Sequence, residues 1–315
     1  MLTSYLTKAT NNRKTLIMKR YTTLKTTLLV VGALLVATLA GCEPERTTYD
    51  GPNYIMFSSE RQDLGVMDSE EWFEIPITAT RTADTDRNVG VEIIAARSNA
   101  IYGLHYTIES TTVTIPAGEL TAKLRIKGYP DAIGVADNLG ITLSLAIEDE
   151  DVWEEYGTET EVYLHKCCPL DMNAFTGYAV VTSTWAMQYM NLESILVKTH
   201  LDETMPNTIV VEDMYYAGYD IRITFQNENR LEPLIAMSEP QVMGSTGEAF
   251  GTIYGNGKLM MMQPADSGSY YSPCEGFLLQ YVTVYVEEVG TVGSYAHVIE
   301  WISDDEAERI LREGV

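Results

Sequence analysis

Cys42 is the residue of this sequence with the most sharply defined chemistry, because it ends the tetrapeptide Leu39-Ala40-Gly41-Cys42. Three basic residues between positions 19 and 25 and an apolar run over 28–37 precede it. This order of charge, short apolar run and small residues is typical of a lipoprotein signal, and the run is too short for a stable bilayer-spanning helix. We therefore expect residues 1–41 to be a signal peptide. The thiol of Cys42 would then carry a diacylglycerol, each buried methylene of which contributes roughly 0.8 kcal/mol to membrane attachment.

Three further cysteines can form one disulfide. Cys167 and Cys168 are adjacent, and Cys274 lies far along the chain in a segment rich in Ser, Gly and Pro. In an oxidising compartment one of the pair can bridge to Cys274, and Cys168 with Cys274 is the bridge we name. The alternative of three unpaired thiols stays open. No metal site is expected, because no Cys-x-x-Cys motif or neighbouring histidine pair supplies four ligands.

The sequence offers no catalytic constellation. It contains no Gly-x-Ser-x-Gly elbow, no P-loop, no His-Glu-x-x-His helix and no Gly-x-Gly-x-x-Gly fingerprint. The four histidines, at positions 105, 165, 200 and 297, are scattered on or beside expected strands, where surface or hydrogen-bonded structural roles are the rule. A carboxylate pair for glycoside hydrolysis would need a measured separation and a cleft. We therefore assign no catalytic residue and no cofactor, and predict that the chain is not an enzyme.

Tyrosines form two clusters that are suited to binding. Tyr215, Tyr216 and Tyr219 share one strand-to-turn segment, and Tyr270 and Tyr271 lie in a loop rich in Gly and Ser. Exposed tyrosine rings can stack on the apolar faces of sugars or anchor a protein partner. The alternative is packing in the walls of a β structure, because strands favour tyrosine and the chain holds 20 of them.

Charge and length narrow the classes of function. The 315-residue chain has a formal net charge of −24, and the expected signal peptide holds six basic residues and no acidic one, so the mature chain is more acidic still. Repulsion from phosphate, without a basic stripe to offset it, excludes nucleic acid as a partner. The mature chain is long enough for two domains of ordinary size.

The first half of the mature chain shows the two-residue alternation of strands with one buried face. Seven short strands are expected over residues 54–57, 73–77, 89–93, 113–115, 120–126, 141–147 and 162–164. Turn-rich segments separate them, which favours a β-sandwich with two apolar inner faces. The acidic run over 148–151 reads as a solvated loop, because its side chains alternate in direction and do not converge on a cation.

Three segments of this half carry a resemblance to a known family. They are Ala100-Ile101-Tyr102-Gly103-Leu104-His105-Tyr106, Val113-Thr114-Ile115-Pro116-Ala117-Gly118-Glu119 and Ile141-Thr142-Leu143-Ser144-Leu145. The pattern resembles a Calx-beta-type domain, which implies an immunoglobulin-like sandwich. Several members of that family bind calcium, but His105 stands where an aspartate is usual, and no calcium ligand is assigned.

The second half is expected to form an antiparallel barrel. A boundary falls at Cys167-Cys168-Pro169, and nine strand-like segments follow, at residues 175–182, 195–201, 208–214, 221–225, 231–237, 249–254, 259–262, 277–286 and 295–302. Short connections between them favour a meander of neighbouring strands. Ser303 followed by an acidic turn predicts a helix from about Asp304 to Arg312. The Phe175-Thr176-Gly177-Tyr178 opening, the strand count and the preceding signal make this half similar to the lipocalin-like or barrel-like C-terminal domains of Gram-negative surface lipoproteins of unknown function.

We therefore predict an all-β chain with a signal peptide over 1–41, a linker over 42–52, a Calx-beta-like sandwich over 53–168 and a barrel-like domain over 169–315. We expect a lipid-anchored protein of the outer membrane or cell surface, outside the cytoplasm, with the membrane as one partner. Its expected role is non-catalytic recognition of a glycan or an envelope protein. The alternatives are a structural or adhesive subunit and, least favoured, a hydrolase with a cryptic carboxylate site.

Overall fold

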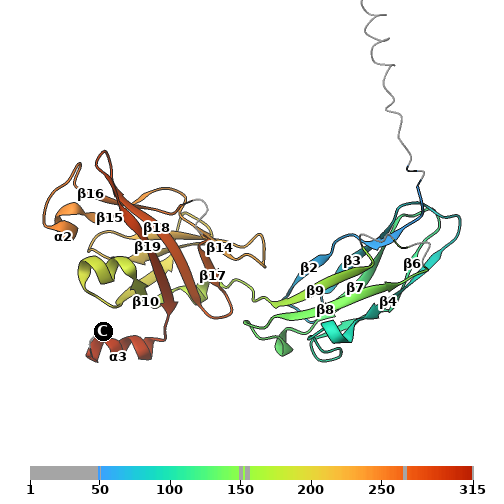
Figure 1. Ribbon diagram of the computed structural model, residues 1–315. Coiled ribbons are helices and arrows are strands. Elements are labelled where there is room, and N and C mark those ends of the chain that lie inside the picture. Colours follow the sequence, from blue (N-terminus) through green and yellow to red (C-terminus); the bar gives the residue numbers. More distant parts are fainter. Residues whose placement is uncertain (1–48, 50, 149–151, 153–156, 265–267, 314–315) are drawn as a thin grey trace, which may run out of the picture. The chain divides into compact units, whose positions relative to one another are not determined.

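The computed structural model describes residues 49, 51–148, 152, 157–264 and 268–313, and Figure 1 shows its strands and helices. Cys42, the expected signal peptide and three of the four residues of the acidic run over 148–151 lie outside the described residues. The described part is almost all β. The predicted order of a sandwich, an antiparallel barrel and a short terminal helix is confirmed.

Two sheets make the sandwich. One has the strand order β1-β3-β7-β5 and the other β2-β9-β8-β4-β6. The strands are β1 (Ile55–Phe57), β2 (Arg61–Val66), β3 (Trp72–Ala79), β4 (Arg87–Ile93), β5 (Tyr106–Ile108), β6 (Thr112–Ile115), β7 (Thr121–Gly128), β8 (Leu139–Ala146) and β9 (Glu159–Lys166). Two short 3₁₀ turns, η1 (Ala95–Arg97) and η2 (Pro130–Ala132), follow β4 and β7. All pairings are antiparallel except that of β2 with β9, which is parallel.

The core of the sandwich follows from the alternation in the sequence. Ile75 and Ile77 on β3 are fully buried, while Glu74 between Phe73 and Ile75 is exposed. Buried side chains of both sheets, such as Ile126 and Val162, belong to one apolar cluster. Each fully buried aliphatic side chain stabilises the fold by about 1.5–3 kcal/mol.

Nine strands form where seven were predicted. The two missing from the prediction are β2 and β5. β5 has only three residues, and the first half of β2 is polar, with Arg61 and Asp63 forming an ion pair on its surface. Neither segment carries the alternation on which the prediction rested.

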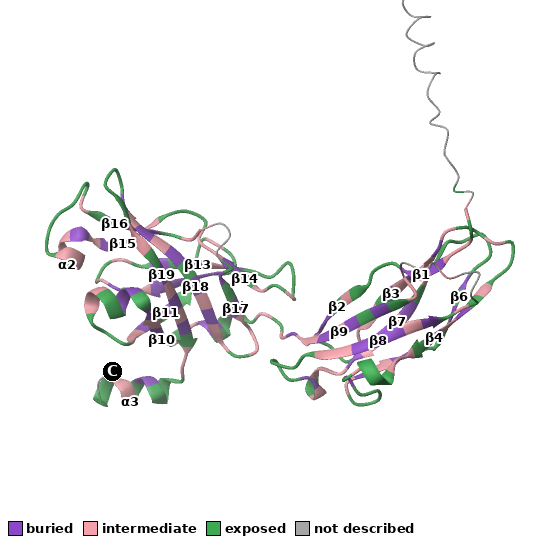
Figure 2. Cartoon of the chain, viewed as in Figure 1, coloured by how far each residue is buried: buried purple, intermediate pink, exposed green. Residues whose placement is uncertain are grey.

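Eight strands of the second half close into a barrel. The order β10-β11-β12-β13-β14-β17-β18-β19 is completed by the pairing of β19 with β10, and every pairing is antiparallel. The strands are β10 (Gly177–Ser183), β11 (Ile195–Leu201), β12 (Thr208–Glu212), β13 (Ile221–Gln226), β14 (Leu234–Ala236), β17 (Tyr270–Ser272), β18 (Phe277–Val286) and β19 (Gly290–Trp301). A hairpin of β15 (Gln241–Ser245) and β16 (Lys258–Met262) pairs with β18 through β16, and its buried side chains join the core of the barrel. The interior is filled by side chains of one apolar cluster, and Figure 2 shows buried positions recurring along the barrel strands.

Helical segments cover the strands at a few points. They are η4 (Met172–Phe175), the π-helix η5 (Ala186–Met190), α2 (Thr246–Phe250) and α3 (Asp304–Glu313). The terminal helix agrees with the prediction, and Ser303 Oγ accepts the Glu306 N–H at 3.3 Å as expected of an N-cap. The strand predicted over 249–254 is wrong, because helix α2 occupies its start. Ser245 and Glu248 form a reciprocal capping box there, and Gly251 ends the helix in the left-handed region.

Candidate functional site

A pocket of about 600 Å³ brings together segments that are far apart in the sequence. All of its residues belong to the compact unit Pro52–Val315. One wall is the loop before β14, a second is β17 with the turn into β18, and a third is the end of β9 with the linker that follows. Its lining residues are Asp63, Val135, His165, Lys166, Cys167, Cys168, Asn229, Arg230, Leu231, Glu232, Pro233, Tyr270, Tyr271, Ser272, Pro273, Cys274, Glu275 and Phe277.

The aromatic surface of this pocket comes from β17 and the start of β18. Tyr270 is 38% exposed, whereas Tyr271 is buried in the barrel core. Consecutive strand residues point to opposite faces, so only one of the two can present its ring to a ligand. Phe277 meets Tyr270 edge to face, with the ring centroids 6.0 Å apart. The pocket therefore presents one accessible tyrosine ring that is supported by a second aromatic ring.

Two of the charged side chains that line the pocket, Asp63 and Arg230, are paired with charged neighbours. Asp63 accepts two hydrogen bonds from the Arg61 guanidinium and lies 2.7 Å from His165 Nε2. The hydrogen bonds from Arg61, followed by that of His165, lower the pKa of Asp63 to about 2. Arg230 Nη1 donates to Glu71 Oε2 at 2.6 Å and to the Gly65 carbonyl at 3.2 Å. These pairs hold the two side chains in place, and the lining as a whole carries charges of both signs, since Lys166, Glu232 and Glu275 also belong to it.

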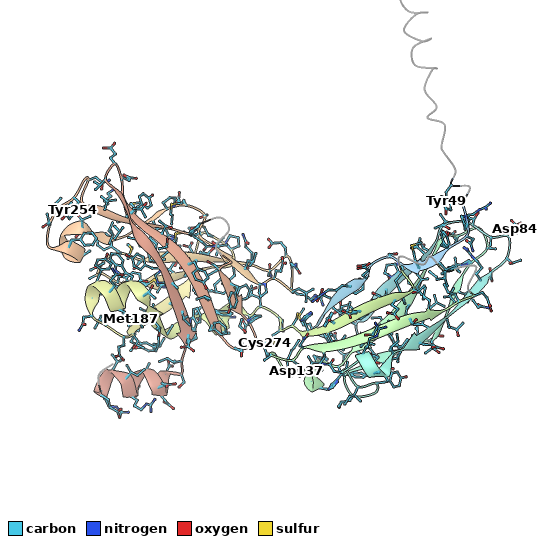
Figure 3. The ribbon with its side chains drawn as sticks, viewed as in Figure 1. Tyr49, Asp84, Asp137, Met187, Tyr254 and Cys274 are labelled. Atoms are coloured by element: carbon cyan, nitrogen blue, oxygen red, sulfur yellow. A yellow bond between two sulfur atoms is a disulfide. The ribbon has the colours of Figure 1, made fainter. Side chains whose placement is uncertain are left out.

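A disulfide forms part of the pocket wall. Cys168 and Cys274 are joined with an S–S distance of 2.20 Å, and Figure 3 labels Cys274 at this position. This is the bridge named from the sequence, where three unpaired thiols were the alternative. Cys167 is a free, buried thiol that donates to the Arg230 carbonyl at 3.3 Å, and burial raises its pKa. The disulfide holds the linker after β9 against the turn between β17 and β18.

The other tyrosine cluster does not contribute to the pocket. Tyr215, Tyr216 and Tyr219 lie in the connection between β12 and β13, and none of them lines it. Tyr216 and Tyr219 are half-buried, and the Tyr216 ring covers Gly244, where an added Cβ would collide with a ring carbon. The expected ligand contact of Tyr215 needs correction, as does that of Tyr271, because both side chains are buried in the barrel core.

Tyr215 instead belongs to a polar cluster inside the barrel. Its hydroxyl lies 2.8 Å from His297 Nδ1 and donates to Ser183 Oγ at 3.2 Å, while Ser183 Oγ lies 3.0 Å from the same His297 nitrogen. Burial lowers the pKa of His297 to about 3, so the ring is neutral. The three side chains are buried, so no substrate reaches them. Ser183 and His297 therefore form a structural hydrogen-bonded pair, which agrees with the structural role expected for the histidines.

The remaining histidines also have structural partners. His105 Nδ1 accepts the Ile101 N–H at 3.0 Å, and His200 Nδ1 lies 3.0 Å from Glu212 Oε1. Among the described residues, no group of three or more His, Cys, Asp or Glu side chains is arranged to hold a metal ion. None of the helices described in the structure combines the length and the apolar character that crossing a bilayer requires.

Several pocket residues were not predicted from the sequence. The loop over 229–233, Lys166 and Phe277 were missed. One feature of the sequence could have indicated part of the pocket. A bond between Cys168 and Cys274 brings residues 165–168 beside residues 270–277. The disulfide alternative therefore also implied a shared surface that contains Tyr270.

Taken together, fold and site define an all-β protein in which a sandwich and an eight-stranded barrel share a surface pocket with one accessible tyrosine. The chain belongs to the family described as "Domain of unknown function (DUF4984)", whose model matches residues 155–313. No curated protein matches the chain in sequence.

Similar solved structures match either a smaller part of the chain or most of it. The apo form of the Calx CBD1 domain is 16% identical, with a TM-score of 0.31, and covers 37% of this chain and 98% of that one. A protein of unknown function from Bacteroides ovatus is 11% identical over 78% of this chain and 89% of its own, with a TM-score of 0.34. An auxiliary nutrient binding protein from Bacteroides thetaiotaomicron VPI-5482 is 14% identical over 77% of this chain and 90% of its own, with a TM-score of 0.28. These are likenesses of fold alone.

Proposed function

We propose that the chain is a lipid-anchored, non-catalytic binding protein of the cell surface, and that the pocket around Tyr270 holds a neutral glycan. The observation that carries this proposal is the accessible Tyr270 ring, supported by Phe277, in a pocket of about 600 Å³. That volume falls within the range of about 300–1,000 Å³ that is typical of small-ligand sites. A tyrosine ring can cover the apolar face of a sugar while its hydroxyl bonds to water or ligand.

The polar groups of the pocket suit sugar hydroxyls. Asn229, Glu232 and Glu275 line it, and the Glu275 carboxylate accepts the Ser272 hydroxyl at 3.1 Å. Carboxylates and amides accept or donate several hydrogen bonds each, as a polyhydroxylated ligand requires. The lining mixes both signs of charge, and Asp63 and Arg230 already have ionic partners, so the pocket favours a neutral ligand over a charged one.

The test is the Tyr270→Ala variant of the full-length protein. A glycan array identifies the best neutral ligand, and calorimetry then measures its affinity. We expect Tyr270→Ala to weaken binding by about tenfold or more, because the stacking ring is lost.

Tyr281→Ala is the matched control. Tyr281 is 41% exposed, close to the 38% of Tyr270, and lies on β18 outside the pocket. We expect this variant to bind the glycan like the wild type. If no glycan on the array binds, or if both variants lose affinity equally, the pocket is not the glycan site.

The proposed lipid anchor is tested separately, at Cys42. Two observations support a lipid-anchored protein outside the cytoplasm: the signal pattern before Cys42, and the disulfide, which is typical of proteins in oxidising compartments. We expect Cys42→Ser to move the protein from the membrane fraction to the soluble fraction, because the acceptor of the lipid is lost. Intact-mass analysis of the wild type should show cleavage before Cys42 and an added diacylglycerol. Wild-type protein with an unmodified, uncleaved N-terminus would contradict the anchor.

A further inference from the structure

A second hollow lies at the tip of the hairpin formed by β18 and β19. We call it the hairpin groove. It has a volume of about 710 Å³ and is lined by Met262, Thr283, Tyr285, Val286, Glu287, Glu288, Val289, Gly290 and Thr291. None of these residues lines the pocket around Tyr270. The two hollows are therefore separate sites on the chain.

Large apolar side chains are exposed in and beside the hairpin groove. Val289 is 56% exposed, and Met262 on the neighbouring strand β16 is exposed as well. The loop that follows α2 adds Ile253, which is 67% exposed, and the exposed Tyr254, which Figure 3 labels. Adjacent large apolar residues exposed in this way are typical of interaction surfaces.

The loop and the hairpin tip are in contact. A Cβ added at Gly255 would lie 2.9 Å from Val289 Cγ2 and 3.0 Å from the Glu287 carbonyl, so the glycine lets the two backbones approach. Asn256 Nδ2 also donates to Glu287 Oε2 at 2.8 Å. The exposed apolar side chains of the loop and of the hairpin tip therefore belong to one surface.

The charged side chains that line the hairpin groove are all negative. Glu287 and Glu288 are exposed, and the lining contains no Lys, Arg or His. The nearby Lys258 begins β16 and is not part of the lining. The overall net charge of −24 strengthens the negative potential around these two carboxylates. A cationic partner is the complement of this surface.

We propose that the hairpin groove docks a polypeptide segment in which lysine or arginine side chains alternate with aliphatic or aromatic ones. The apolar side chains of the segment would cover Met262 and Val289, and its cations would pair with Glu287 and Glu288. This goes beyond glycan binding at Tyr270, since it gives the barrel a protein partner at a separate site. Electrostatic attraction of this kind raises the association rate and decreases with salt.

The test uses a fluorescent peptide in which leucine and lysine alternate, titrated against the full-length protein. Two comparison peptides replace lysine with glutamate or leucine with serine. We expect only the leucine–lysine peptide to bind well. The double variant Glu287→Gln with Glu288→Gln should weaken binding by about tenfold and flatten its salt dependence. Met262→Ser with Val289→Ser should weaken it to a similar degree while leaving the salt dependence in place.

The matched control is Glu308→Gln with Glu313→Gln on α3. Both glutamates are exposed, so this variant has the same net charge as the double variant at the groove. We expect it to bind the peptide like the wild type, and thermal unfolding of each variant checks that the fold is retained. Equal losses in the groove variant and the α3 variant would overturn the proposal, as would good binding of the glutamate peptide. Loss of array-glycan binding without loss of peptide binding in the groove variant would also overturn it, by assigning the groove to a glycan.

Discussion

Replacing Cys274 with serine is expected to lower the free energy of unfolding by about 3 kcal/mol, within the range measured for native disulfides. The bond from Cys168 to Cys274 spans 106 positions of sequence and encloses the strands from β10 to β17. A cross-link over so long a loop removes much of the conformational freedom of the unfolded chain. Denaturant-induced unfolding of the wild type and of Cys274→Ser, followed by circular dichroism, measures the difference.

Cys167→Ser is the control for this variant. Its thiol is unpaired and makes one hydrogen bond, to the Arg230 carbonyl, so its replacement leaves the cross-link in place. We expect a loss of about 1 kcal/mol or less, as for a single polar exchange in a buried position. The wild type in a strong thiol reductant should unfold like Cys274→Ser. Unfolding of Cys274→Ser at the same denaturant concentration as the wild type would show that the bond does not stabilise the native state.

Only part of the pocket could be predicted from the sequence. The segments around Cys168 and Cys274 could be placed side by side, because a disulfide between two cysteines is a specific chemical expectation. The loop over 229–233 carries no such signal, and only the folded barrel places it beside Tyr270. Sites built from distant loops depend on strand order and register, which one sequence does not specify.

Strand prediction succeeded where one face of a strand is buried and the other exposed. β3 and β18 follow this pattern along their lengths, and both were found. β15 and β17 were missed, since three-residue β17 is too short to show a period and β15 contains a bulge between Val242 and Gly244. In helix α2, the apolar pair Ala249 and Phe250 was mistaken for part of a strand, although the Ser245 and Glu248 capping box was readable.

The sequence also does not show which tyrosines of the two clusters are buried. Alternation along a strand implies that Tyr270 and Tyr271 face opposite sides, but not which of them faces the core. The barrel closes with Tyr271 inside and Tyr270 outside. Tyr215 was not recognisable as buried either, because its hydroxyl is satisfied by Ser183 and His297, which lie on β10 and β19. Such partners become visible only when the barrel is closed.

The cluster of Tyr215, Ser183 and His297 should make the protein sensitive to mild acid. His297 is fully buried, and it lies against the hydroxyl groups of Ser183 and Tyr215 and the Ala296 backbone, with no carboxylate among these partners. Burial holds its pKa in the folded state at about 3, below the usual 6.5. In the unfolded state, His297 takes up a proton as the pH falls below about 6.5.

The sign of the effect follows from this difference in proton binding. Between about pH 6.5 and pH 3 the unfolded state binds more protons at His297 than the folded state does, so stability falls as the pH falls. The limiting slope is about 1.4 kcal/mol per pH unit. Asp63, with a folded pKa of about 2, and Asp202, whose pKa is lowered by hydrogen bonds from Thr204, add to the loss chiefly below about pH 4.5, as their unfolded forms become protonated. The window from about pH 6 to pH 4.5 therefore reports chiefly on His297.

Denaturant unfolding across that window should separate His297 from every other group. In His297→Asn, an amide takes the place of the Nδ1 side of the ring and does not titrate, so we expect a lower stability but a nearly flat pH dependence. His200→Asn is the comparison, because His200 is exposed and pairs with Glu212 on the outer surface. We expect this variant to keep the wild-type slope. A wild-type slope in His297→Asn would mean that the acid sensitivity arises elsewhere, and that proton uptake by His297 in the unfolded state is not its cause.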